Sequence, residues 1–156
     1  MNPYASFLGG QDPRHVISTT ANRLNDIVRA LGGAVDQSPG PEKWSARQVI
    51  CHLADTELVF AFRLRQSLAE PHHIIQPFDQ DSWATRYAIY DAMSAVEMFQ
   101  ATRDWNLKLI ASMTVAELEK KLTHPERGEM ALGIIIETMA GHDLNHLAQI
   151  EAISAA

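Results

Sequence analysis

The chain has 156 residues, the length of one domain with a sizeable core, and we expect a single domain over residues 1–156. It carries 13 Lys and Arg against 19 Asp and Glu, a net charge of −6 at pH 7, and it has no basic cluster that could follow a phosphate backbone. Binding to nucleic acid is therefore not expected. The one cysteine, Cys51, excludes an intramolecular disulfide framework.

No segment is typical of secretion or of membrane insertion. The N-terminal stretch MNPYASFLGG lacks the charged and apolar regions of a signal peptide. The longest apolar run, residues 130–136, contains Gly133 and is far shorter than the roughly 20 residues that span a bilayer. We expect a cytoplasmic protein without membrane contact.

Two helices are expected in the first half of the chain. Apolar residues recur at helical spacing from Pro13 to residue 31, where Gly32 and Gly33 end the pattern. Ser45 and Gln48 then have the spacing of a capping box, in which each side chain bonds the backbone amide of the other. A second helix is expected from there to about residue 69, before Pro71.

A long connection separates these helices from the rest. Residues 70–91, EPHHIIQPFDQDSWATRYAIYD, show no sustained period, and we expect them to cross the bundle. A capping-box pattern at Ser94 and Glu97 predicts the start of a third helix that runs to about residue 113. Thr114 and Glu117 repeat the pattern for a short helix over 115–122, and a last helix is expected over 131–153.

No stretch alternates with period two between turn residues, so no strand is expected. The predicted fold class is all-α, a four-helix bundle of the up-down-down-up type with a long crossover connection between helices two and three.

Two histidines occupy core positions of the last helix. The core-facing series has the three-four spacing of a bundle seam and consists of Leu132, Ile135, Met139, His142, His146, Ile150 and Ile153. His142 and His146 are either core histidines satisfied by hydrogen bonds or a metal-binding pair, because the i, i+4 spacing lets one helix supply two nitrogens to one metal.

The second helix offers a third ligand and two catalytic candidates. His52 lies at the edge of the apolar face, in one stripe with Thr56, Val59 and Arg63. Arg63 is either a surface cation or a substrate anchor. Glu57 falls within the apolar face, where an unpaired carboxylate is costly, so it either pairs with a buried partner or serves the site.

The remaining histidines, His15, His72, His73 and His124, have no spacing partner except each other and are expected at the surface. Cys51 should face away from a metal held by the adjacent His52, because one residue on a helix is a rotation of about 100°. We interpret Cys51 as a small buried or interfacial residue.

Several motifs resemble the DinB superfamily of DinB/YfiT-like metalloenzymes. They are Trp44-Ser45 leading into CHLADTE, the PFDQDSWA stretch, and HPERGEM followed by AGHDLNHLAQIEAI, and they cover nearly the whole chain in the family's order. The resemblance implies a four-helix bundle that binds a divalent metal through His52, His142 and His146. The resemblance also implies a dimer. The family includes thiol-dependent S-transferases and isomerases that use bacillithiol, mycothiol or glutathione, besides many members without a known activity.

Three imidazoles without a protein carboxylate or thiolate leave open positions on a metal, which is typical of a reactive site. Zinc and nickel both suit such ligands. A metal of this kind can lower the pKa of bound water towards about 7 or hold a thiol as its thiolate. We therefore expect a metal-dependent enzyme acting on a small-molecule substrate. Thiol S-transfer is the first reading, metal-assisted hydrolysis the second, and a non-catalytic metal or small-ligand binding protein the alternative.

The long connection offers candidates for a substrate wall, namely Asp79, Asp81, Trp83, Tyr87 and Tyr90. Trp83 is preferred, because an indole offers both apolar area and a donor, and Asp79 and Tyr87 are included with it. Ordinary loop packing and capping is favoured for Asp81 and Tyr90.

A second apolar strip on the second helix, Cys51, Leu58 and Phe62, predicts a homodimer unless the connection covers the strip.

Overall fold

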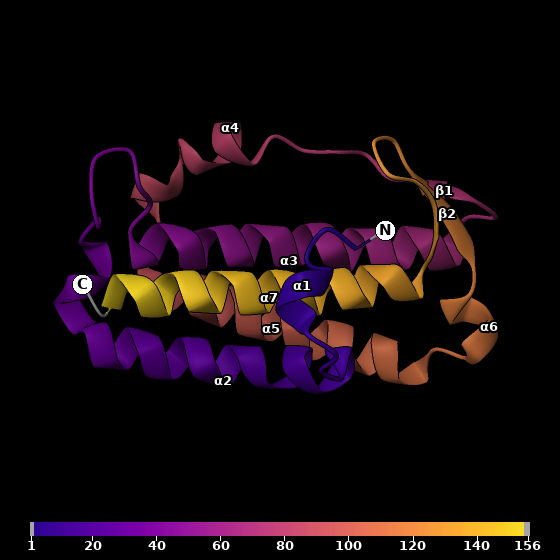
Figure 1. Cartoon of the computed structure of the whole chain (residues 1–156), viewed down its shortest axis with the longest axis horizontal. Helices are drawn as coiled ribbons and strands as arrows, with labels where there is room; N and C mark the ends of the chain where they lie inside the picture. The colour runs from indigo at the N-terminus through magenta and orange to yellow at the C-terminus, as the bar shows by residue number, and fades with distance from the viewer. Residues whose placement is uncertain (1, 155–156) are drawn as a thin grey trace.

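The computed structural model describes residues 2–154. Four long helices lie along one another, α2 (Pro13–Leu31), α3 (Ala46–Ala69), α5 (Ala92–Ser112) and α7 (Gly133–Ser154), and confirm the predicted four-helix bundle (Figure 1). Both α2 and α3 contact both α5 and α7, so the four helices form a closed ring around one core. No described helix is long and apolar enough to cross a membrane.

Helix starts follow the capping chemistry of the sequence with one exception. The Ser45 side chain accepts from the Gln48 amide and Gln48 accepts from the Ser45 amide, as predicted, and the Thr114–Glu117 pair does the same before α6 (Val115–Leu118). The box expected at Ser94 and Glu97 is wrong. Helix α5 begins three residues earlier, because the Asp91 carboxylate caps it by accepting from the Ser94 amide at 2.9 Å.

The expectation of no strands is also wrong. Strands β1 (His73–Ile74), β2 (Lys121–His124) and β3 (Gly128–Ala131) form a small sheet in that order, with β1 parallel and β3 antiparallel to β2. Strands of two to four residues are too short to show alternation. Because β2 takes residues 121–124, α6 ends at Leu118 rather than at residue 122. Because β3 takes residues 128–131, α7 begins at Gly133 rather than at residue 131.

Two segments outside the bundle cover its helices. The connection 70–91 contains α4 (Gln80–Ala84) and the 3₁₀ turn η2 (Tyr87–Ile89), and it runs back along α3, so α3 and α5 point the same way (Figure 1). The short helix α1 (Ala5–Leu8), absent from the sequence expectation, packs against α7. A Cβ at Gly141 would lie 2.6 Å from the Tyr4 carbonyl oxygen, so the glycine permits this approach.

The core is divided by a polar layer. One apolar cluster includes Leu24, Leu53, Phe99 and Leu147, and a second includes Ile17, Phe60, Ile110 and Met139. On each bundle helix a buried polar residue lies between members of the two clusters; these residues are Thr20, Glu57, Arg103 and Asp143. The polar layer therefore crosses the bundle at mid-length, at the level where α3 and α7 also carry histidines.

Candidate metal centre

Three histidines converge between α3 and α7. His52, His142 and His146 each offer a ring nitrogen, and these nitrogens lie within 4.8 Å of one another. The Nε2 atoms of His52 and His142 are 3.1 Å apart. All three side chains are at most 9% exposed. Seam positions on α7 and the edge position on α3 thus bring one set of imidazoles together.

Burial keeps these imidazoles neutral. It lowers the pKa of His52 to about 3, with a further contribution from the neighbouring His146, and it holds the pKa of His142 well below the usual range. The pKa of His146 is also lowered by burial, although its bond to Gln149 opposes the shift. Neutral imidazole is the form that binds a metal.

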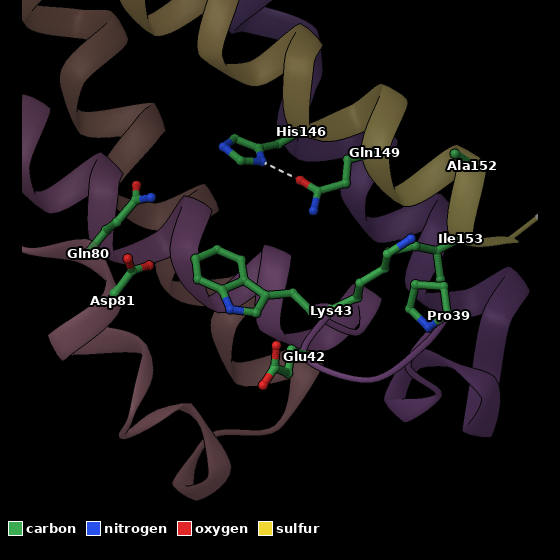
Figure 2. Close-up of a pocket in the computed structure, with 10 residues that line it drawn as sticks. Pro39, Glu42, Lys43, Gln80, Asp81, His146, Gln149, Ala152 and Ile153 are labelled. Carbon is green, nitrogen blue, oxygen red and sulfur yellow. Dashed lines mark hydrogen bonds between the residues drawn. The ribbon is translucent and has the colours of Figure 1, made fainter.

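Gln149 fixes the orientation of His146. Its Oε1 lies 2.8 Å from Nδ1 of His146, the contact drawn in Figure 2. An amide oxygen only accepts, so Nδ1 carries the proton and Nε2 is the free nitrogen. Orientation of a ligating histidine through its second nitrogen is usual in metal sites.

The residues present fit a divalent metal. Two nitrogens at about 2.05 Å from a tetrahedral zinc are about 3.3 Å apart, close to the Nε2 separation of His52 and His142. Nδ1 of His52 is buried without a hydrogen-bond partner among residues 2–154. The two nitrogens of an imidazole point in different directions, so it is Nε2 of His52, facing Nε2 of His142, that offers a lone pair to a cation between the rings.

Two pockets meet at the histidines. A pocket of about 190 Å³ is lined by His52 and His142, and one of about 620 Å³ by His146 (Figure 2). Gln80 of α4 lines both pockets. The smaller pocket is completed by residues of α3, α7, the connection, the N-terminal segment and the β2–β3 turn, namely Tyr4, Thr56, Phe60, Arg63, Pro77, Phe78, His124, Glu126, Arg127 and Thr138.

Glu57 pairs with a buried partner, the first of its two alternatives. Its oxygens accept from Arg103 Nη2 at 2.7 Å, from Arg103 Nε at 3.0 Å and from Asn106 Nδ2 at 2.7 Å. Arg103 also donates to Asp143 at 2.6 Å, and Asp143 accepts from Thr20 at 2.7 Å. Both oxygens of the Glu57 carboxylate thus accept hydrogen bonds from other residues inside the bundle.

Arg63 faces the smaller pocket together with His52 and Thr56, three members of the stripe expected on this helix. It is partly buried rather than a free surface cation, and it donates weakly to the Gln76 carbonyl at 3.3 Å.

The three substrate-wall candidates of the connection do not line either pocket at the histidines. Trp83 is 40% exposed and packs on Phe78 with ring centres 4.8 Å apart. Asp79 caps α4, and Tyr87 is buried beside Trp44. Their contact with substrate stays a prediction. Asp81 and Trp44 line the larger pocket, and Tyr90 borders a separate one.

Two histidines expected at the surface are buried, which corrects that prediction. His73 is 5% exposed, with Nδ1 2.7 Å from Glu70, and His124 is 6% exposed at the smaller pocket. Both belong to the small sheet, which was not predicted. His15 and His72 are exposed as expected, and Cys51 is buried.

Tyr4 and Glu126 were missed as pocket residues. The Tyr4 ring meets His142 edge-on at 5.2 Å between centres. A glycine inside a helix, directly before His142, was the available signal for the close approach of Tyr4.

Fold and site together define a four-helix-bundle protein with a buried three-histidine cluster suited to a metal ion. Residues 17–150 match the family described as the DinB superfamily. A Bacillus cereus protein provisionally named a metal-dependent hydrolase is 30% identical over 151 residues, covering 88% of this chain and 85% of that protein. A similarly named Oceanobacillus iheyensis protein is 29% identical over 156 residues, covering 92% and 89%.

The solved structure of YfiT from Bacillus subtilis, described as a probable metal-dependent hydrolase with an unusual four-helix bundle topology, has the same fold. Its TM-score is 0.84 at 22% identity, covering 92% of this chain and 84% of that one. The chain belongs to the DinB superfamily.

Proposed function

We propose that this protein is a metal-dependent hydrolase of small molecules, with His52, His142 and His146 as ligands of one divalent ion, zinc or nickel. The observation that carries the proposal is the convergence of three buried, neutral imidazoles, two of which line the smaller pocket and the third the larger. A divalent ion with open positions supplies Lewis-acid polarisation of the substrate and lowers the pKa of a water molecule. Relatives provisionally named metal-dependent hydrolases support the reaction class.

The chain's own groups would bind and move protons around this site. Glu126 is the only carboxylate among the described residues that line the smaller pocket, and it can accept a proton from the attacking nucleophile. Glu57 is unsuited to that role because both of its oxygens accept hydrogen bonds within the polar layer. Thr56, whose Oγ1 lies 3.5 Å from Nε2 of His52, offers a hydroxyl beside the cluster.

Thiol S-transfer is the second candidate, favoured by one observation. Two pockets open on opposite members of the same histidine cluster, and the larger, at about 620 Å³, falls within the usual size range of ligand sites. A transfer reaction needs places for a donor and an acceptor. A low-molecular-weight thiol in the larger pocket would supply the second reactant.

One experiment tests both candidates and the alternative of mere binding. Protein purified without an affinity tag is analysed for zinc and nickel, then assayed on small esters and amides with and without bacillithiol, mycothiol or glutathione. We expect about one ion per chain and thiol-independent turnover that disappears with chelator and in His142→Ala. Turnover only with thiol would favour transfer, and stoichiometric metal without turnover of any substrate would favour binding alone.

Glu126→Gln tests the proton acceptor. Loss of a general base typically lowers the rate 10²–10⁴-fold, so kcat should fall in that range while metal content is unchanged. Glu129→Gln is a matched control, because Glu129 is an exposed residue of the neighbouring strand that lines neither pocket. An unchanged kcat in Glu126→Gln would remove Glu126 from the mechanism.

A further inference from the structure

The smaller pocket carries an excess of positive charge in a chain whose net charge is −6. Its charged lining residues are two arginines, Arg63 and Arg127, and one acid, Glu126. A divalent ion on the three neutral histidines adds to the same sign. The pocket is therefore a place where an anion is electrostatically favoured.

The partly buried Arg63 differs from the buried Arg103 in its hydrogen-bond and ion-pair partners. Arg103 contacts the carboxylates of Glu57 and Asp143, whereas Arg63 forms no salt bridge within residues 2–154. Its Nε is buried and has no hydrogen-bond partner in that range. Burial, and secondarily Arg127, lowers the pKa of Arg63 to about 10, so it still carries its charge at neutral pH. A charged, partly buried donor without a partner is costly until an acceptor reaches it.

The β2–β3 turn brings two further donors to the same pocket. Arg127 lies in this turn, held by its backbone amide bond to the His124 carbonyl at 3.2 Å. The Glu126 amide donates to Nδ1 of His124 at 3.2 Å, so in the neutral ring Nε2 carries the proton. Burial lowers the pKa of His124, which keeps the ring neutral and makes Nε2 a donor. The HPERG stretch thus supplies a donor from each of two residues.

We propose that Arg63, with Arg127 and His124, binds an anionic oxygen group of the substrate, a carboxylate or a phosphate, beside the histidine cluster. Guanidinium groups match both anions through paired hydrogen bonds. The pocket volume of about 190 Å³ lies below the usual range for whole drug-sized ligands, so the anionic part is small. The proposal names the substrate class of the proposed hydrolase and therefore rests on that function.

Anion binding is measured directly with inorganic phosphate and, separately, with acetate. Each is titrated into zinc-loaded and metal-free protein, and the arginine Nε–H signals are followed by NMR. We expect the Arg63 signal to shift in both forms, and the tighter anion identifies the preferred chemistry. A charge-assisted contact of this kind changes affinity about tenfold to a hundredfold, so Arg63→Gln should raise Kd by at least tenfold.

Arg29→Gln is the matched control, because Arg29 is an exposed arginine of α2 that lines neither pocket, and its Kd should stay within about twofold of wild type. Arg63→Lys keeps the charge without the planar fork and should give an intermediate Kd, which covers the case in which Arg63→Gln does not fold. Equal Kd values in wild type and either Arg63 variant overturn the proposal. So does binding that appears only with zinc and ignores Arg63, since the anion then sits on the metal alone.

A pair of substrates separates this inference from the proposed function. The monoester of a short dicarboxylic acid and the corresponding diester differ by one free carboxylate. Wild type should hydrolyse the monoester with at least tenfold higher kcat/KM than the diester. Arg63→Gln should lose that preference, whereas the control Arg29→Gln should keep it. Turnover of both esters without preference overturns the anion site alone. Turnover of neither, with phosphate bound at Arg63, overturns hydrolysis and leaves the anion site supported.

Discussion

The Arg103 group and the histidine cluster are two buried polar regions at the same level of the bundle, and they are completed in different ways. Arg103 uses Nε, Nη1 and Nη2 to reach two carboxylates and the Ile17 carbonyl, at 2.6 to 3.2 Å. In the histidine cluster, Nε2 of His52 faces another imidazole and Nδ1 has no partner among residues 2–154.

The difference indicates that the Arg103 group stabilises the fold, whereas the histidine cluster is available for a ligand. Carboxylates that meet a matched cation inside the bundle have little capacity left for a ligand. Neutral imidazoles retain lone pairs for a cation from outside, as His146 does at Nε2 because its Nδ1 donates to Gln149. In the sequence both regions appear as polar residues on an apolar helix face. They are distinguished only by the side chains that contact them in the folded structure.

The largest effect on stability should come from Arg103→Met. It leaves Glu57 and Asp143 buried without their cation, and breaking a buried pair typically costs about 3–5 kcal/mol. Urea unfolding should show this loss, while Arg29→Met on the surface changes the free energy of unfolding by less than about 0.5 kcal/mol. A loss below about 1 kcal/mol in Arg103→Met would mean that the carboxylates are satisfied without it.

Gly141→Ala should have the next largest effect. The new Cβ would lie 2.6 Å from the Tyr4 carbonyl oxygen, so the N-terminal segment must move away from His142. Alanine favours the helix by about 1 kcal/mol, yet we expect a net loss of about 1–3 kcal/mol from the overlap.

Denaturant unfolding and limited proteolysis near α1 measure that change. Gly33→Ala is the control, since its Cβ would meet nothing within 4 Å. Greater stability of Gly141→Ala with unchanged protection of α1 would contradict the prediction.

The double variant His142→Leu/His146→Leu should shift stability in the opposite direction to Arg103→Met. Apolar side chains at these seam positions replace buried polar rings, so the metal-free protein should gain about 1 kcal/mol or more. Metal content should fall to background. The large core implies that the metal serves activity more than folding, and each single alanine variant should stay helical and cooperative.

Metal analysis and thermal unfolding of the same samples test this contrast. An unfolded double variant would assign the histidines a structural role. Stoichiometric zinc or nickel in the double variant would show that the ligands lie elsewhere.

Phe62→Glu tests the predicted homodimer, and we expect it to have the smallest effect on the Arg103 group and on the histidine cluster. Phe62 is 56% exposed and Leu58 42%, whereas Cys51 of the same strip is buried. Light scattering should give a dimer for wild type and a monomer for the variant, with metal content and fold stability unchanged. A monomer mass for wild type across micromolar concentrations would remove the dimer.

Helical spacing in the sequence predicted those features that lie within a single helix. The burial of His142 and His146 on one seam, the stripe of His52 and Arg63, and the capping box at Ser45 all follow from local geometry. That His52 belongs with the other two needed the family resemblance, because no local pattern fixes which faces of two helices meet.

Pairings between distant segments could not be predicted in this way. Arg103 lies 46 residues from Glu57, and its role depends on the register of α5 against α3. The HPERG stretch appears in the sequence only as part of a family motif, and its donors reach the pocket because β2 and β3 pair. Tyr4 likewise arrives from a segment that carries no helical period of useful length.

The metal-binding histidine candidates and much of the pocket wall lie on different parts of the chain, and this has an evolutionary consequence. The histidines belong to α3 and α7, while much of the pocket wall comes from the N-terminal segment, the connection and the β2–β3 turn. Surface segments accept insertions and substitutions that bundle helices do not. Descendants of this scaffold can therefore change which molecule they admit by altering peripheral segments alone, with the three-histidine cluster inherited intact.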